Sequence, residues 1–230
     1  MRTVARQTDR TGSCEAASLL VQINMNALTT ELLIATRNAG KLIEFRSLIS
    51  DLPVRLLSLS EFPETTEVEE TGETFAENAA LKARVYATQT RRLTLADDSG
   101  LEVDALGGAP GVFSARYAGE GASDAQRNAR LLSDLARAID QTRRARFVCS
   151  IAIADAESRV LNISTGICEG RIADEPDGAN GFGYDPLFIP DGYAQTFGQL
   201  SQEIKQQISH RARALANARA FLLEHFLRSA

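Results

Sequence analysis

Residues 93–119 place two adjacent acidic side chains directly after an apolar run, which limits what the chain can form there. The run Leu93–Ala96 is typical of a short buried strand. Asp97 and Asp98 follow it, and the Ser-Gly pair after them predicts a turn before a second short strand. Adjacent carboxylates repel each other and lose hydration on burial, so a buried pair needs a positive partner.

Two interpretations of this acidic pair are open. A hard divalent cation such as Mg2+ binds carboxylate oxygens, and in proteins it is commonly held together with phosphates. Alternatively, the two acids belong to a solvated surface turn, where Asp, Ser and Gly are common. The rest of the chain has to decide between a metal site and an ordinary turn.

The composition argues against several classes of partner. The 230 residues are enough for one domain or two lobes with an ample core. A net charge of -5 and the absence of Trp disfavour binding to long nucleic acid, and no apolar run is long enough to span a membrane. Three cysteines without metal-ligand spacing fit a reduced, cytoplasmic compartment.

The first 29 residues carry little hydrophobic periodicity and lack the apolar segment of a secretory signal peptide. The first strong strand pattern begins only at residues 31–35. We therefore expect a non-core extension over residues 1–29 and one folded domain over residues 30–230.

A turn of small and polar residues follows that first strand. Residues 36–41 lead from the strand into a helical pattern over residues 42–49. Backbone N–H groups and the dipole at such a helix start attract anions, and Lys41 adds a positive charge. The stretch is not a P-loop, which requires Gly where Ala35 stands and Ser or Thr where Leu42 stands. The simpler alternative is a solvated lysine in the first turn.

A second helix is predicted from about residue 74 to residue 87. Thr74 and Glu77 have the spacing of a capping box. Asn78 and Lys82 lie four residues apart, so they share one side of the helix. The acidic segment 63–70 before the helix and the aspartate pair after it offer anionic neighbours to Lys82, although a lysine on a helix is usually exposed to solvent.

The other predicted elements complete an α/β pattern. Residues 56–59 form a short strand, and a helix capped by Ser123 or Asp124 runs to about Ile139, with that isoleucine facing inward. Strands over residues 146–153 and 160–167 form a hairpin, and residues from 201 onward are helical.

A glycine-dense loop over residues 175–186 contains Phe182, Tyr184 and Asp185. Such a loop allows the backbone to approach a flat ligand that stacks on an aromatic ring, although a plain surface turn is the alternative. Farther along, Lys205, His210 and Arg211 stand close together, whereas His225 lies among apolar residues and is interpreted as a packing residue.

Taken in order, these segments resemble the inosine triphosphate pyrophosphatase family. The likeness covers the chain from about Leu32 to its end, and Arg37 departs from it because the family commonly has Gly there. The N-terminal extension is also untypical. The matching segments are residues 35–41, 69–72, 75–83, 96–101, 107–117, 181–186 and 209–211.

The resemblance implies an elongated mixed β-sheet with flanking helices that form two lobes around a central cleft. It also implies a homodimer that uses Mg2+ to hydrolyse ITP, dITP and XTP to the monophosphate and pyrophosphate. Glu69 and Asp98 are expected to hold the metal, with Asp98 also accepting the proton of the attacking water and Lys82 acting beside it. Lys41, Lys82 and Lys205 are assigned to the phosphates, and Phe182 to stacking on the purine. The expected substrate-binding residues are Thr36, Arg37, Asn38, Ala39, Gly40, Lys41, Ser99, Phe182, Gly183, Tyr184, Asp185, Lys205, His210 and Arg211.

Two other functions are compatible with the same residues. One is a pyrophosphatase of related fold that acts on modified pyrimidine or methylated nucleotides. The other is a nucleotide-binding sensor without catalytic activity.

Overall fold

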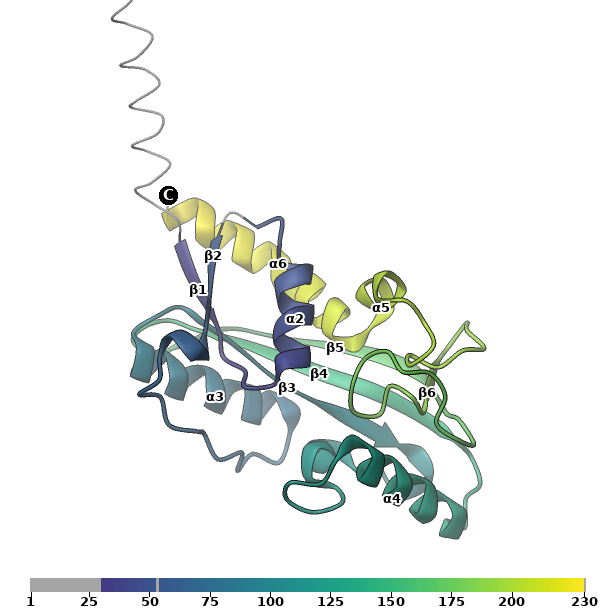
Figure 1. Ribbon diagram of the computed structural model, residues 1–230. Helices are drawn as coiled ribbons and strands as arrows, with labels where there is room; N and C mark the ends of the chain where they lie inside the picture. Colours follow the sequence, from purple (N-terminus) through teal and green to yellow (C-terminus); the bar gives the residue numbers. More distant parts are fainter. Residues whose placement is uncertain (1–29, 53, 230) are drawn as a thin grey trace, which may run out of the picture.

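The computed structural model describes residues 30–52 and 54–229, and the extension expected at residues 1–29 lies outside them. One curled, six-stranded mixed sheet runs the length of the molecule (Figure 1). Its spatial order is β2-β1-β3-β4-β5-β6, parallel between β2, β1 and β3 and antiparallel from β3 onward. The strands are β1 Thr30–Ile34, β2 Val54–Ser58, β3 Thr94–Val103, β4 Arg144–Ala154, β5 Val160–Ile172 and β6 Phe188–Pro190.

Helices cover both faces of this sheet (Figure 1). Among the described residues, none of them is both long and apolar enough to cross a bilayer. The helices are α2 Ala39–Leu48, α3 Phe75–Thr90, α4 Asp124–Arg137, α5 Gln202–Ile208 and α6 His210–Ser229, with short 3-10 helices at Leu59–Glu61, Asp104–Leu106 and Gly111–Arg116.

Strand alternation divides the core at one end of the sheet. Successive side chains of a strand point to opposite faces, so Leu32 and Leu95 pack with α2 and α6, whereas Leu33 and Ala96 pack with α3. The two apolar layers hold the parallel strands between helices, which is the usual arrangement for parallel strands. They form the first lobe.

The second lobe lies at the other end of the long strands. Here α4 packs Leu131 and Leu135 against Leu101 and Phe147 of β3 and β4, together with Phe188 of β6. In Figure 1, α4 and β6 lie beyond the ends of α2 and α3, so the same long strands run through both lobes. The expected mixed sheet with two lobes is confirmed.

The predicted turn at Ser99-Gly100 is wrong, because β3 is continuous through both residues. Each of its residues from Thr94 to Val103 has a partner on β4, and this ladder outweighs the local turn preference of Asp-Ser-Gly. Gly100 is required for space instead. A Cβ there would lie 2.3 Å from Ser114 Oγ and 2.6 Å from the Gly111 carbonyl oxygen.

The other elements agree with the predictions in type and differ in extent. The capping box at the start of α3 and the β4–β5 hairpin are confirmed. Ile139 is fully exposed instead of facing inward, because α4 ends at Arg137 and Ala138 turns the chain into an extended conformation. The three-residue strand β6 was not predicted, since it depends on pairing with distant residues 170–172.

Gly166 on β5 lets α6 lie directly on the sheet, which yields a stability prediction. A Cβ at this position would lie 2.2 Å from Ala214 N and 2.3 Å from the His210 carbonyl oxygen, and backbone atoms cannot rotate away. We expect Gly166→Ala to lower the free energy of unfolding by about 2–3 kcal/mol, measured by urea denaturation. Ile167→Thr, at the next and exposed position, is the control and should change it by less than about 0.5 kcal/mol.

Candidate active site

The site forms where β1 stops pairing with β3. The last paired residues are Ile34 and Leu95, after which β1 turns away into α2 and leaves that edge of β3 open. Asp97 and Asp98 follow Leu95 after one residue, Ala96, and point to opposite faces of the strand. Both carboxylates reach one cavity of about 360 Å³, because no neighbouring strand separates the two faces there.

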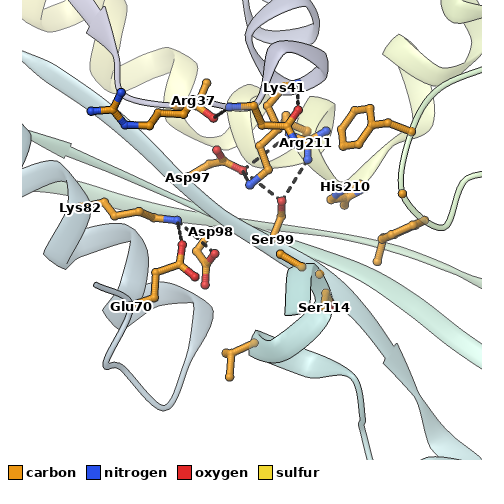
Figure 2. A pocket seen from close by; sticks show the side chains of 18 of the residues that line it. Arg37, Lys41, Glu70, Lys82, Asp97, Asp98, Ser99, Ser114, His210 and Arg211 are labelled. Atoms are coloured by element: carbon orange, nitrogen blue, oxygen red, sulfur yellow. Dashed lines mark hydrogen bonds and ion pairs between the residues drawn. The ribbon is translucent and has the colours of Figure 1, made fainter. Parts of the chain in front are cut away.

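Asp97 faces α2 and α6 and is surrounded by positive groups (Figure 2). Its Oδ2 lies 2.8 Å from Lys41 Nζ and 3.7 Å from Arg211 Nε, and it accepts a hydrogen bond from Ser99 Oγ at 3.1 Å. Burial raises the pKa of Asp97, but Lys41 and Arg211 outweigh it and lower this pKa to about 2. Asp97 is therefore a charged anchor and a weak base.

Asp98 faces α3, and its pKa is shifted in the opposite direction to that of Asp97. Its carboxylate accepts hydrogen bonds from Asn78 Nδ2 and Lys82 Nζ, both at 3.2 Å, and Glu70 Oε1 lies 2.6 Å from the same ammonium group. Burial raises the pKa of Asp98, Lys82 lowers it, and Glu70 raises it further, so the net shift is upward. Two neighbouring carboxylates with pKa values shifted apart mark Asp98 as the better proton acceptor.

The α3 helix presents Asn78 and Lys82 to the site together, as their spacing predicts. Thr74 caps the helix, and Asn78 ties down the preceding segment by accepting from Gly72 N at 2.7 Å. Burial lowers the pKa of Lys82, but the charges of Asp98, Asp97 and Glu70 raise it more, so its ammonium group stays protonated. The expected anionic neighbours of Lys82 are confirmed.

The turn before α2 opens onto the same cavity. Asn38 is the N-cap of α2 and accepts from Lys41 N at 3.0 Å, while Thr36 Oγ1 accepts from Asn38 N at 3.2 Å. Arg37 is exposed and donates to the Thr65 carbonyl at 2.8 Å, so its side chain joins the turn to the segment before α3. Thr36, Arg37, Asn38 and Lys41 line the cavity, whereas Ala39 and Gly40 do not.

The loop around Phe182 and the start of α6 close the other end of the cavity. Lys205 is buried there and forms ion pairs with Asp185 at 2.6 Å and Glu44 at 2.7 Å. Its Nζ lies 4.8 Å from the centroid of the Phe182 ring. This placement differs from the expectation that Lys205 joins the phosphate-binding lysines, because Asp185 and Glu44 hold it beside the aromatic ring.

Glu44 of α2 was missed by the sequence reasoning. It is 5% exposed and receives ion pairs from Lys205 and Arg211. Burial raises the pKa of Glu44, but Arg211 and Lys205 lower it below its usual value. Its one sequence signal is its position three residues after Lys41, on the same side of the helix. An acid on a helix is normally interpreted as exposed to solvent.

His210 and Arg211, at the start of α6, are both buried. The His210 ring stacks on Phe147 with centroids 4.7 Å apart, and burial followed by the charges of Arg211 and Lys205 lowers its pKa well below 6.5. Arg211 donates to Ser99 Oγ at 3.0 Å and lies 5.6 Å from the Phe182 ring centroid. Neutral His210 and charged Arg211 therefore have different capacities to donate hydrogen bonds.

Two carboxylates, Glu70 and Asp98, are placed to hold a cation, since Lys82 already bridges them. Glu69, the expected ligand, is exposed and does not line the cavity, whereas its neighbour Glu70 does. Among the described residues no group of three or more His, Cys, Asp or Glu side chains could hold a metal ion. Mg2+ is usually bound through one or two carboxylates plus substrate phosphates, so the pair fits this ion.

The cavity has further lining residues that the sequence reasoning did not select. Ser114 Oγ accepts from Leu101 N at 2.9 Å and donates to the Gly111 carbonyl oxygen at 2.7 Å, and Tyr184 donates to the Ser114 carbonyl at 2.9 Å. Asp124 and Arg127 come from the first turn of α4. Of the residues expected at the substrate, those lining the cavity are Thr36, Arg37, Asn38, Lys41, Ser99, Phe182, Gly183, Tyr184, Asp185, Lys205, His210 and Arg211.

Comparison with known proteins decides the family. Residues 32–221 match the Ham1 family. The chain belongs to the Ham1 family. It is 51% identical over 192 residues to a dITP/XTP pyrophosphatase of Desulforamulus reducens, covering 84% of this chain and 95% of that one. A dITP/XTP pyrophosphatase of Shouchella clausii is 49% identical over 185 residues, covering 80% and 92%.

Solved structures agree with this membership. A HAM1 protein from Coxiella burnetii superposes with a TM-score of 0.79 at 45% identity, covering 85% of this chain and 100% of that one. A dITP/XTP pyrophosphatase from Mycobacterium abscessus gives 0.67 at 44% identity, covering 82% and 98%. The family resemblance expected from the motifs is confirmed.

The neutral, buried His210 of this Ham1 chain predicts a specific dependence of stability on pH. A lowered pKa in the folded state means that the unfolded chain binds a proton near pH 6.5 and the folded chain does not, so stability falls as the pH drops below 6.5. From pH 7 to 5.5 we expect wild type to lose about 1 kcal/mol more than His210→Phe, which keeps a ring beside Phe147. Urea unfolding at both pH values measures this. Equal losses in the two proteins would show that His210 does not carry the effect.

Proposed function

We propose that this protein hydrolyses dITP, ITP and XTP to the nucleoside monophosphate and pyrophosphate, removing deaminated purines from the nucleotide pool. One observation carries the proposal. A buried carboxylate with a raised pKa, Asp98, contacts the ammonium group of Lys82 in a cavity that also receives Lys41 and the start of α2. These are the groups that hydrolysis of a phosphoric anhydride requires, and curated relatives of the chain carry the name dITP/XTP pyrophosphatase.

The triphosphate lies along the start of α2, between Lys41 and Lys82. Backbone N–H groups at a helix start attract anions, and two ammonium groups neutralise the oxygens that would otherwise repel a nucleophile. Lys41 is held by Asp97 and Lys82 by Glu70 and Asp98, so both lysines are oriented before the substrate arrives. Such positioning supplies much of the rate in phosphoryl transfer.

Glu70 and Asp98 would hold Mg2+ together with phosphate oxygens, and the bound ion would neutralise part of the phosphate charge. Asp98 takes the proton of the attacking water, since Asp97 is already neutralised by its ion pairs with Lys41 and Arg211. Lys82 remains protonated throughout and faces the negative charge that develops on the phosphate.

The base binds at the Phe182 end of the cavity, beside Lys205 of α5 and Arg211 at the start of α6. Arg211 and Lys205 are hydrogen-bond donors near the ring of Phe182. A 6-oxo purine offers an acceptor to such donors, whereas adenine presents an amino group and leaves a donor unpaired. That mismatch costs about 1–3 kcal/mol, roughly a tenfold to hundredfold preference for ITP over ATP.

The family resemblance carries two further proposals. We infer a homodimer and a cytoplasmic location, as expected for enzymes that act on the free nucleotide pool. Light scattering coupled to size-exclusion chromatography measures the first, and fluorescence imaging of the tagged full chain measures the second.

The decisive experiment measures pyrophosphate release with Mg2+ across ITP, dITP, XTP, the common nucleoside triphosphates, and modified pyrimidine and methylated nucleotides. We expect steady turnover with the three deaminated purines and at least about tenfold lower kcat/KM for ATP. A preference for a modified pyrimidine or methylated nucleotide would instead show that the protein acts as a pyrophosphatase for those nucleotides. Binding without turnover would make it a sensor.

Asp98→Asn tests the proton acceptor. The amide is a weaker metal ligand and cannot take a proton, so kcat should fall by about a hundredfold or more. Its melting temperature should stay close to that of wild type, because Lys82 keeps Glu70 as a partner. Glu102→Gln on the same strand is the matched control. Near-normal turnover in folded Asp98→Asn would show that Asp98 is not the proton acceptor.

Glu69 and Glu70 form a natural pair of variants for the metal. Because Glu70 lines the cavity and Glu69 is exposed, Glu70→Gln should raise the Mg2+ concentration for half-maximal activity by roughly tenfold, and Glu69→Gln should leave it unchanged. Activity is followed against Mg2+ at saturating ITP. The reverse ranking would restore Glu69 as the ligand.

A further inference from the structure

The loop that carries Phe182 is held in its own shape by backbone geometry. Phe182 N donates to Asp185 Oδ2 at 2.8 Å, and Asp185 N donates to the Phe182 carbonyl at 3.2 Å. Gly183 has a φ of 63°, in the left-handed region that favours glycine. The turn therefore behaves as one unit, and whatever holds Gly183 also sets the place of the Phe182 ring.

Two side chains of α4 hold Gly183. Its N–H donates to Asp124 Oδ2 at 2.7 Å, and its carbonyl accepts from Asn128 Nδ2 at 3.2 Å. Asp124 and Asn128 are four residues apart, so they lie on the same side of the helix. Both backbone polar groups of one loop residue are thus bound by one helix. Asn128 is 5% exposed, and the bond to the charged Asp124 is of the stronger, charge-assisted kind.

The α4 helix is itself fixed in the second lobe. Ser123 and Gln126 form its capping box, and Leu131 and Leu135 are buried in the core of that lobe. The other oxygen of Asp124 is paired with Arg127, so each oxygen of this carboxylate has a protein partner. The contacts to Gly183 therefore join the loop to a rigid element and not to another loop.

The surroundings of the Phe182 ring leave little free space. A Cβ on Gly40 would lie 2.5 Å from Phe182 Cδ1, and the cations of Lys205 and Arg211 lie 4.8 and 5.6 Å from the ring centroid. A small shift of the loop would change both the stacking surface and its distance from these donors. Displacements of about 1 Å are enough to cost a large part of such a preorganised arrangement.

We propose that Asp124 and Asn128 are positioning residues for base selection, acting through Gly183 to set where Phe182 meets the purine. The proposal rests on the function proposed above, since it concerns the base end of the same site. The phosphate end, with Lys41 and Lys82, is built from α2, α3 and β3 and does not depend on α4.

The experiment separates the two ends of the site. kcat/KM is measured for ITP and ATP, and inorganic tripolyphosphate, which has no base, is used as a competitive inhibitor. Asp124→Ala and Asn128→Ala should lower kcat/KM for ITP by about tenfold to a hundredfold and for ATP by much less, because each leaves a Gly183 polar group unpaired. The inhibition constant of tripolyphosphate should stay within about twofold, since phosphates carry no base identity.

Two further variants exclude a merely structural effect. Asp124→Asn keeps an oxygen that can accept from Gly183 N, so it should restore most of the ITP preference. Glu203→Ala removes the corresponding first-turn acid of α5, which is exposed, and should leave both rates unchanged. Melting temperatures confirm that each variant is folded.

Parallel losses for ITP and ATP, a matching rise in the tripolyphosphate inhibition constant, or an Asp124→Asn as damaged as Asp124→Ala would each overturn the proposal. If wild type shows no preference for ITP, the proposed function fails instead. Hydrogen exchange of residues 181–185 in the substrate-free protein then tests separately whether Asp124 and Asn128 hold this loop in place. Faster exchange there in both alanine variants, with α2 unchanged, supports it, and unchanged exchange overturns it.

Discussion

The open edge of β3 is the constraint on which the site depends. If β1 continued beside β3 past Leu95, the two faces of the sheet would be separated, and Asp97 and Asp98 would lie in different environments with no common space. Because β1 turns into α2 at that point, one carboxylate anchors a lysine from α2 and the other a lysine from α3. The strand thereby brings cations from both helix layers to one cavity.

A buried set of charges joins the rest of the site to this edge. Glu44 receives Lys205 and Arg211, and Arg211 continues to Ser99 and Asp97 on β3. Burying such charges costs hydration, and pairing only offsets this cost when the geometry is good. The main effect of this buried set of charges is therefore to select one arrangement of α2, α6 and the loop that carries Phe182. Each alternative arrangement would leave a buried charge without its partner.

Sequence patterns predicted the features that depend on residues close together in the chain. The Thr74–Glu77 capping box gave the start of α3, and the motif order gave the family and most of the cavity. The local sequence predicts a turn at Ser99 and Gly100 and misses their strand conformation, because that conformation comes from pairing with β4, about fifty residues away. Glu44 and Glu70 point into the site because they pair with Lys205 and Lys82, which other segments of the chain bring there. The sequence around each glutamate does not indicate where its side chain points, so it does not separate Glu70 from Glu69.

The long antiparallel strands have a mechanical consequence. Leu95 and Leu101 of β3 belong to different cores, as do Ile151 and Phe147 of β4, so single uninterrupted strands connect the lobes. A change in the width of the cleft must then come from bending of a hydrogen-bonded ribbon and not from rotation about a linker. Such a ribbon resists bending, so the width of the cavity is set mainly by the curvature of the sheet.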